Sequence, residues 1–451
     1  MIQLGLLLLG VEAVRRHWVT LAVAGFLWTL LGVVILAAPL EGIHAITMQA
    51  LSLLLVIEGV VTLTAGFLAG ARGRLWLVKA LALIVPGVLI AETPLRSVML
   101  ISILFGVALS IDGAIRLAST LVVRFPGWRV ALVASGCELV LALLALLPWP
   151  VSYEATVPFC VGLALVSSGW TMLRSALLLH RLSPDAPITS LPLFEQQRGW
   201  SMPLALPGAI PLEPQPAGGT PSMIVHVWTP VGSAAHPMRR PVIDRYLAVV
   251  DRDGSVSTGH AALELLPDLY ISHYRLAEQD RTGQEFRLAL HGGARNDVAG
   301  MFQPGYRAEV AEWWEADQHV AFRHFNAERL RSFWAAYRQD ATYNLTNRNC
   351  SVVVAMALDA ALEGVVRGAW VWPPLLRLLV HPDLFLATLL RKRAWTLTWT
   401  PGLVLDYARA LQRVVDPPEL SWLAMLRQAI GHYRRVRREH PLAAAAAQDA
   451  G

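Results

Sequence analysis

Long apolar segments dominate the first 181 residues, whereas the rest of the chain mixes short apolar runs with polar ones. A helix of about 20 apolar residues crosses the roughly 30 Å hydrocarbon core of a bilayer. Six segments approach this length: Trp18–Ala37, Ile46–Ala69, Leu75–Ala91, Val98–Ser119, Val130–Leu147 and Thr156–Leu179. The apolar run Met1–Gly10 is too short to span, and it lacks the basic segment and cleavage site of a signal peptide. Residues 1–181 are therefore predicted to form an all-α membrane bundle of six spans.

An internal repeat divides these spans into pairs. A proline closes each odd-numbered span, at Pro39, Pro94 and Pro148, with spacings of 55 and 54 residues. A second marker lies late in each following span, and its members are Glu58-Gly59, Asp112-Gly113 and Ser168-Gly169. A repeat of this period indicates tandem copies of one supersecondary unit. We expect three helical hairpins with glycines at the close helix contacts.

The arginines and lysines of the short loops predict the orientation, because they concentrate on the cytoplasmic side of a membrane protein. One side carries Arg96 alone, and the other carries Arg15, Arg16, Arg72, Arg74, Lys79, Arg116, Arg124, Arg129, Arg174 and Arg181. Six spans place both ends on the basic side. We expect a multi-pass protein of the inner (plasma) membrane whose C-terminal half is cytoplasmic, where a thiol stays reduced.

A change of pattern marks the second half of the chain. Residues 182–222 contain nine prolines and no periodicity, which predicts an extended tether. Residues 223–364 carry strand-like runs, "MIVHVW", "VIDRYLAVV", "GHAALEL" and "LYISHYRL", followed by the helical patterns "AEVAEWWEADQHV", "AERLRSFWAAYRQDA" and "SVVVAMALDAALEG". Strands followed by helices indicate an α+β domain. Residues 365–451 form an extension whose proline-broken pieces either lie on the bilayer as amphipathic helices or pack against this domain.

Composition narrows the function. Only 16% of the residues are charged, against about 25% in ordinary soluble domains. The net charge of +5 on 451 residues does not indicate nucleic-acid binding. The three cysteines, Cys137, Cys160 and Cys350, exclude a disulfide framework. Cys350 is the only one in the polar half of the chain, which makes it the candidate nucleophile.

Three residues form the candidate site: Cys350, His260 and His273. An apolar helix is predicted to begin at Cys350, with Asn347 and Asn349 as candidate caps, and a helix N-terminus lowers the pKa of a thiol. His260 opens a strand after a glycine, where it could act as the base. His273 follows the short "LPD" connection, so hairpin pairing would bring it beside His260 to orient the imidazole ring.

Two resemblances extend this interpretation. The "HWVTLAVAGFLWTLLGVVILAAP" entry, the "LLLVIEGVVTL" span and the hairpin repeat resemble the HdeD-like membrane proteins over about 165 residues. That resemblance implies a membrane platform associated with acid-stress tolerance. The order "GHAALEL…YISHY…NRNCSVVVA" resembles the circularly permuted papain-like thiol hydrolases, the NlpC-type branch that includes lecithin:retinol acyltransferase-like enzymes. It implies a papain-like domain with Cys350 as nucleophile, His260 as base and His273 as orienting residue. The chain lacks the "NCEH" of the acyltransferases, which favours peptide or amide substrates.

Other polar groups have structural interpretations. The histidine pairs His319/His324 and His226/His236 lack the spacing of a zinc site, so neither a metal nor a cofactor is expected. Asn296, Tyr343 and Asn344 are either oxyanion donors or turn residues, and we favour turns. The membrane acids Glu58, Asp112 and Glu138 are candidates for proton handling, but packing or pairing is favoured, with Arg116 as the helix-face partner of Asp112.

The sequence thus predicts a membrane-tethered cysteine hydrolase that acts on peptides or amides through an acyl-thioester. The partners expected are the lipid bilayer, a peptide or acyl substrate, and a second copy of the chain bound through the bundle. Two alternatives remain open. The first is a lipid acyl hydrolase or acyltransferase, and the second is a non-enzymatic membrane scaffold in the stress response.

Overall fold

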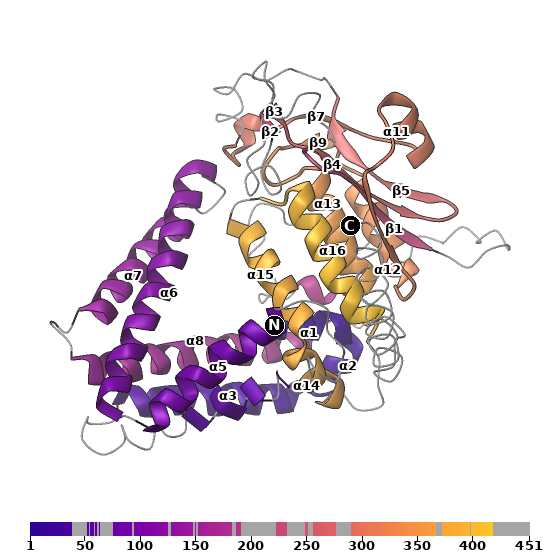
Figure 1. The fold of residues 1–451 in the computed structure, drawn as a ribbon. Coiled ribbons are helices and arrows are strands. Elements are labelled where there is room, and N and C mark those ends of the chain that lie inside the picture. Colours follow the sequence, from indigo (N-terminus) through magenta and orange to yellow (C-terminus); the bar gives the residue numbers. More distant parts are fainter. Residues whose placement is uncertain are drawn as a thin grey trace, which may run out of the picture.

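The computed structural model describes residues 1–37, 75–92, 94–124, 128–147, 152–182, 186–190, 222–231, 249–250, 256–276, 290–366, 372–396 and 398–417, with Trp149 and eight residues between 52 and 63. Helices predominate, and short antiparallel sheets occur in the C-terminal part (Figure 1). The helices of the N-terminal half are α1 (Ile2–Leu9), α2 (Val11–Arg15), α3 (Trp18–Ala37), α5 (Leu75–Glu92), α6 (Pro94–Val123), α7 (Trp128–Leu146) and α8 (Tyr153–Arg181).

Within the described part of the chain, four helical segments are long and apolar enough to cross a membrane. These are Trp18–Ala37, Ser102–Val123, Trp128–Leu146 and Pro158–Arg181. They coincide with the first, fourth, fifth and sixth predicted spans. The third predicted span forms α5 but is not among these four, and most of the second span, including Glu58, lies outside the described residues. The structure therefore confirms a membrane-type helical half, but four of its six expected spans.

The helices pair differently from the predicted hairpins. The α3 helix lies along α8, where a Cβ placed on Gly32 would be 2.7 Å from the carbonyl oxygen of Gly162. The α6 helix lies along α7, and a Cβ on Gly106 would be 2.6 Å from Leu146 Cγ. Gly59 of the second segment meets Ile84 of α5 in the same way, at 2.5 Å. Each even-numbered segment thus packs on the next odd one, and the last packs on the first. The glycines of the described segments therefore lie at contacts between neighbouring predicted hairpins, not within them.

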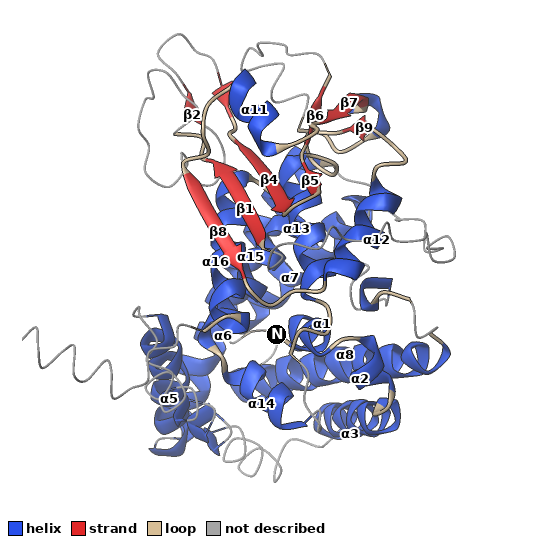
Figure 2. Cartoon of the chain, turned by 90° about the vertical axis from the view of Figure 1, so that its right-hand side faces the viewer, coloured by secondary structure: helices blue, strands red, loops and turns tan. Residues whose placement is uncertain are grey.

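The C-terminal part is built on a four-stranded antiparallel sheet in the order β5-β4-β1-β8 (Figure 2). Its strands are β1 (Met223–Trp228), β4 (His260–Leu265), β5 (Leu269–Ile271) and β8 (Gln318–Phe322). A second sheet joins β6 (His273–Arg275), β7 (Val298–Phe302) and β9 (Thr342–Tyr343), and β2 (Val249–Val250) pairs with β3 (Val256–Ser257). The rest of "VIDRYLAVV" lies outside the described residues.

Helices pack against the sheet and against one another in this part of the chain. They are α11 (Tyr306–Glu312), α12 (Ala327–Tyr337), α13 (Cys350–Leu362), α14 (Trp372–Val380), α15 (Pro382–Thr396) and α16 (Pro401–Val415). Side chains alternate across each strand, so Val225, Val227, Leu263 and Phe322 face the core formed with α12, α13 and α16. The opposite face of β4 carries His260 and Glu264. The predicted helix "AEVAEWWEADQHV" is only half right, since it ends at Glu312 and its last residues form β8.

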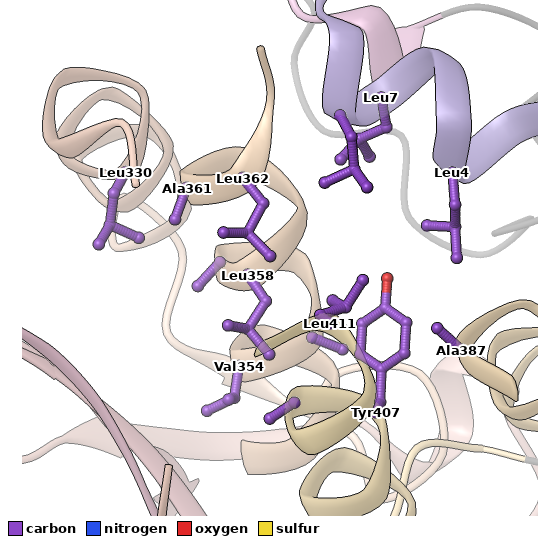
Figure 3. Packing of buried hydrophobic residues seen from close by; sticks show 14 of the residues in the cluster. Leu4, Leu7, Leu330, Val354, Leu358, Ala361, Leu362, Ala387, Tyr407 and Leu411 are labelled. Carbon is purple, nitrogen blue, oxygen red and sulfur yellow. The ribbon is translucent and has the colours of Figure 1, made fainter. Parts of the chain in front are cut away.

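The N-terminal helix α1 belongs to the core of the C-terminal part. Leu4 and Leu7 are buried in one cluster with Leu358 and Leu362 of α13, and Leu4 points toward Tyr407 and Ala387 (Figure 3). The backbone N–H of Gly364 donates to the carbonyl of Leu7 at 3.0 Å. The prediction that Met1–Gly10 does not span is consistent with this packing, but the boundary at residue 181 is corrected. The first residues of the chain complete the domain that begins at Met223.

The segments on either side of the C-terminal domain also contact its core. Ile188, near the start of the predicted linker, is buried, and its N–H donates to Glu363 Oε1 at 3.1 Å, while residues 191–221 lie outside the described part. In the extension, α16 packs on the sheet, and Arg391 of α15 is buried with its Nη1 2.5 Å from the Asp359 carboxylate of α13. Both α15 and α16 therefore pack on the domain, while α14 and α15 together are also apolar enough to form a broken membrane span.

Gly10 provides a stability test of the α1 contact. Its φ of 80° and ψ of 161° lie in a region essentially limited to glycine, and an added Cβ would lie 2.7 Å from Gly364 Cα. We expect Gly10→Ala to lower the free energy of unfolding by about 1–3 kcal/mol, measured by thermal unfolding of the detergent-solubilised protein. The control is Gly293→Ala, because a Cβ there meets nothing within 4 Å. Equal stability of the two variants would contradict the close contact.

Candidate functional site

Cys350 is the first residue of α13, as the sequence predicted. Asn349 caps the helix: its side-chain oxygen accepts a hydrogen bond from the Val352 N–H at 2.8 Å. Its Nδ2 donates to the carbonyl of Leu345 at 2.7 Å, which ties the cap to the preceding loop. Asn347 is not a cap, since its amide donates to the carbonyl of Gly292 at 3.1 Å. The sulfur therefore lies at the positive end of the helix dipole.

His260 reaches the sulfur from the sheet. It opens β4 opposite Trp228 of β1, directly after Gly259, whose φ of 69° and contact with the Trp228 carbonyl require glycine. Its side chain lies close enough to the Cys350 thiol for each group to shift the pKa of the other. Because ring atom Nε2 faces Ser272 and Glu309, Nδ1 is the nitrogen that remains for the sulfur. The two residues that the sequence proposed as base and nucleophile are thus in contact.

Glu309 holds the far side of the His260 ring. Its Oε1 lies 3.1 Å from His260 Nε2. The Ser272 hydroxyl lies between the two groups, 2.9 Å from Nε2, and donates to the same carboxylate oxygen at 2.8 Å. The Tyr270 hydroxyl donates to the second oxygen, Oε2. Glu309 is fully buried, and its two carboxylate oxygens contact His260, Ser272 and Tyr270.

His273 does not occupy the predicted orienting position. The β4–β5 hairpin pairs Leu263 with Ile271, but the strand leaves this sheet at Ser272, and His273 begins β6 of the second sheet opposite Phe302. Its Nδ1 lies 3.0 Å from the Tyr337 hydroxyl and its Nε2 lies 3.4 Å from the Ala341 carbonyl. Successive side chains of an extended segment point to opposite faces. Ser272 therefore faces His260 in place of its neighbour.

The charges of Cys350 and His260 support each other. Burial raises the pKa of the Cys350 thiol, but the charge and hydrogen bond of His260 outweigh burial, so the pKa lies below its usual value. Burial lowers the pKa of His260, but the Cys350 thiolate, followed by Glu309, outweighs it and raises this pKa to about 10. Glu309 keeps a lowered pKa because His260, Tyr270 and Ser272 outweigh its burial. The favoured state is a thiolate–imidazolium pair held by a carboxylate.

Aromatic rings enclose this ion pair. The rings of Trp228, Trp313 and Tyr274 lie 5.5, 5.2 and 5.6 Å from the His260 ring, measured between centroids. Aromatic rings exclude water, and the electron-rich face of such a ring attracts a cation such as the imidazolium of His260. The backbone N–H of Ala261 helps to hold the pKa of Cys350 below its usual value, and it is the candidate donor for a developing oxyanion. Cys350 itself is 7% exposed.

The other predicted polar groups hold the loops around the site. Asn296 Nδ2 donates to the His291 carbonyl at 2.7 Å, and Asn344 Nδ2 donates to Asp297 at 2.7 Å. Both amides have the turn function that the sequence favoured. Glu309 had one signal in the sequence: it shares a helix face with Tyr306 and Trp313, three and four residues away. A carboxylate on an aromatic face indicates a buried acid, but the pattern does not reveal its partner.

Two histidines meet away from Cys350, in a combination that differs from the pairs considered in the sequence. His226 and His319 lie opposite each other on β1 and β8, with their Nδ1 atoms 2.9 Å apart. His226 Nε2 lies 3.0 Å from Glu264 Oε2. His324 contacts Asp416, and His236 lies outside the described residues. Among the residues with described positions, no group of three or more potential ligands could hold a metal ion.

Comparison with known proteins does not extend this description. No family model, no curated protein and no solved structure matches the chain. Its candidate function therefore rests on the residues of the site and on their geometry.

Proposed function

We propose that this chain is a membrane-tethered cysteine hydrolase that forms an acyl-thioester on Cys350. One observation carries the proposal: a buried cysteine at a helix N-terminus contacts a histidine whose other nitrogen faces a buried carboxylate. Nucleophile, base and orienting group in this order are the arrangement that nucleophilic catalysis requires. The resemblance to permuted papain-like thiol hydrolases supports the same assignment, with Glu309 in the role expected of His273.

The reaction follows from the charges. The Cys350 thiolate attacks the substrate carbonyl carbon, and the Ala261 N–H stabilises the oxyanion that forms. The His260 imidazolium gives its proton to the leaving amine, which departs as the carbon–nitrogen bond breaks and leaves an acyl-thioester on Cys350. Neutral His260 then takes a proton from water, whose oxygen attacks the thioester. The carboxylic acid departs, and the thiolate–imidazolium pair is restored.

The membrane half supports a tethering role. We propose that the bundle resembles the HdeD-like proteins, has six spans and places both termini in the cytoplasm of a bacterial-type cell. The loop charges support this orientation, since Arg96 alone lies on the other side. A reporter that is active only in the periplasm, fused after Gly451, provides the check on orientation.

Peptide or isopeptide bonds are the preferred substrates, and acyl lipids are the alternative that the membrane helices and the aromatic surroundings of His260 favour. The purified protein in detergent is given fluorogenic peptide and isopeptide amides in one assay and phospholipid in mixed micelles in another. We expect amide turnover in the native protein and none in Cys350→Ser, because a hydroxyl is a far weaker nucleophile here. Phospholipid turnover without amide turnover would replace the preferred substrate by the alternative.

A further inference from the structure

The membrane helix α6 contacts the cysteine domain at two points. It is one continuous helix of 30 residues from Pro94 to Val123. Its first contact is Asp112 and its second is the carbonyl of Val123, eleven residues later. At 1.5 Å per residue these points are separated by about 16 Å along the helix. In Figure 1, α6 and α7 rise from the end of α8 on the side of the molecule where α15 lies.

The first contact is an ion-pair cluster. Asp112 Oδ2 lies 2.8 Å from Lys392 Nζ, and Asp112 Oδ1 lies 3.6 Å from Arg393 Nη1, both on α15. Within the bundle, Arg116 Nη2 lies 3.2 Å from Asp112, as the sequence predicted, and Arg116 Nε lies 3.5 Å from Glu138 of α7. The hairpin alone thus places one cation beside two carboxylates. Docking of α15 adds two further cations to this cluster, more than the one that the two carboxylates still lack for neutrality.

From α15 the contact continues to the nucleophile helix. Arg391 precedes Lys392 and is 2% exposed, and its Nη1 lies 2.5 Å from the Asp359 carboxylate. The Tyr407 hydroxyl also donates to Asp359, at 2.7 Å. Asp359 is on α13, nine residues after Cys350. Neighbouring side chains of α15 therefore bind the membrane hairpin and the helix that carries the nucleophile.

The second contact leads to the other side of Cys350. The carbonyl of Val123 accepts a hydrogen bond from the Gly292 N–H at 2.7 Å. The carbonyl of Gly292 in turn accepts one from Asn347 Nδ2 at 3.1 Å. Asn347 lies three residues before Cys350, in the loop that Asn349 ties to the start of α13. The end of α6 thus supports the loop that positions the sulfur.

We propose that the α6/α7 hairpin controls the reactivity of the cysteine site through this docking contact. The ion pairs of Asp112 with Lys392 and Arg393, here called the latch, hold α15 against α6. The two contacts bracket Cys350, one through the loop before it and one through α13 after it. Nine residues of α13 measure about 13 Å, close to the separation of the contact points on α6. When α15 is docked on α6, Cys350 and His260 stay close enough to form the thiolate–imidazolium pair. When the bundle releases α15, the two side chains are held less firmly and the pair forms less often. The inference rests on the proposed function, because it concerns the regulation of the same site.

The test measures the second-order rate of Cys350 alkylation by iodoacetamide in the full-length protein, with Cys137 and Cys160 replaced by alanine. We expect Asp112→Asn to lower this rate about 3- to 30-fold, the range of coupling changes along such a contact. Lys392→Gln combined with Arg393→Gln should act in the same direction. Adding Asp112→Asn to that pair should lower the rate no further, since residues that share one contact are not additive.

The matched control is Arg413→Gln, which removes an ion pair of 2.7 Å between α16 and Asp383 of α15 without touching α6. It should alkylate at the parent rate. Asp112→Glu keeps the charge and should restore most of the rate, which separates loss of the latch from loss of the fold. An unreactive Cys350 in the parent protein would contradict the proposed function itself. A reactive parent whose Asp112→Asn variant alkylates equally fast, or whose effects add with those of Lys392 and Arg393, would contradict the latch.

Discussion

Replacing Cys350 with alanine should abolish labelling of the protein by an iodoacetamide-type probe near neutral pH. The thiolate is the reactive form, and His260 holds the pKa of Cys350 below its usual value. A free thiol with a pKa of about 8.5 is roughly 3% ionised at pH 7. A paired thiolate is mostly ionised there, so labelling should exceed that of a model thiol by about tenfold after allowing for its weaker intrinsic nucleophilicity.

The other two cysteines serve as controls for this result. Cys137 lies in α7 and Cys160 lies in α8. Within the described part of the chain, neither thiol is hydrogen-bonded to a histidine. Cys137→Ala and Cys160→Ala should leave the labelling unchanged. If Cys350 labels no faster than a free thiol in the native protein, the domain is a binding scaffold and the hydrolase proposal is wrong.

Turnover should have a narrower pH range than labelling, because it is lost at high pH as well as at low pH. Activity needs both the thiolate and the imidazolium. As the pH falls, activity is lost when Cys350 binds a proton, which happens below the usual thiol range because its pKa is lowered. As the pH rises, activity is lost when His260 gives up its proton, near a pH of about 10. Labelling above that pH should persist, because the thiolate remains while the proton donor for the leaving group is lost.

The sequence predicted correctly those features that depend on residues close together along the chain. The first span runs from Trp18 to Ala37 in both the sequence interpretation and the structure. The helix that begins at Cys350 also follows from neighbouring residues, since Asn349 provides the cap and the apolar residues follow at once. His260 was predicted as the base because it follows a glycine and opens a strand. A residue in that position lies at one end of the sheet, where its side chain can reach a neighbouring group. Each of these features depends on residues within a few positions of one another.

The failures come from contacts between distant residues. A strand that changes sheets at Ser272 has the same alternation as one that continues, so the sequence could not show which of Ser272 and His273 faces His260. Glu309 reaches the ring from a helix 49 residues further along the chain. The repeat in the membrane half identified the small residues at the contacts, but small residues do not specify which helix they meet. For the same reason, an apolar segment such as Leu4–Leu9 does not reveal which core it enters.

Replacing Glu309 should have the second-largest effect on turnover, after Cys350. It should also show whether Glu309 or His273 orients the His260 ring. Glu309→Gln keeps a side-chain oxygen for His260 Nε2 but removes the charge, whereas Glu309→Ala removes both. We expect turnover to fall about 10- to 100-fold in the first variant and about 10³- to 10⁴-fold in the second, as for an orienting group that costs less than the nucleophile. Ser272→Ala should cost less than either, because the carboxylate still lies 3.1 Å from the ring.

The pH profile distinguishes an orienting role from a structural one. The Cys350 thiolate and then Glu309 raise the pKa of His260 above its usual value. Loss of the Glu309 charge must lower that pKa, so the alkaline limb of turnover in Glu309→Gln should move below a pH of about 10. His273→Ala should leave this limb in place. Burial outweighs the hydrogen bond to Ala341 and, with the nearby charge of Arg348, lowers the pKa of His273 to about 4. The ring is therefore neutral and acts as a spacer between Tyr337 and Ala341.

His273→Ala should act instead on stability, because it removes the buried hydrogen bond of 3.0 Å between the ring and the Tyr337 hydroxyl. Such a loss costs about 1–3 kcal/mol of unfolding free energy. His273→Gln, which can still accept from Tyr337, should recover part of it while leaving turnover per folded molecule near the native level. An alkaline limb that moves in His273→Ala and stays fixed in Glu309→Gln would return the orienting role to His273 and overturn the site as described here.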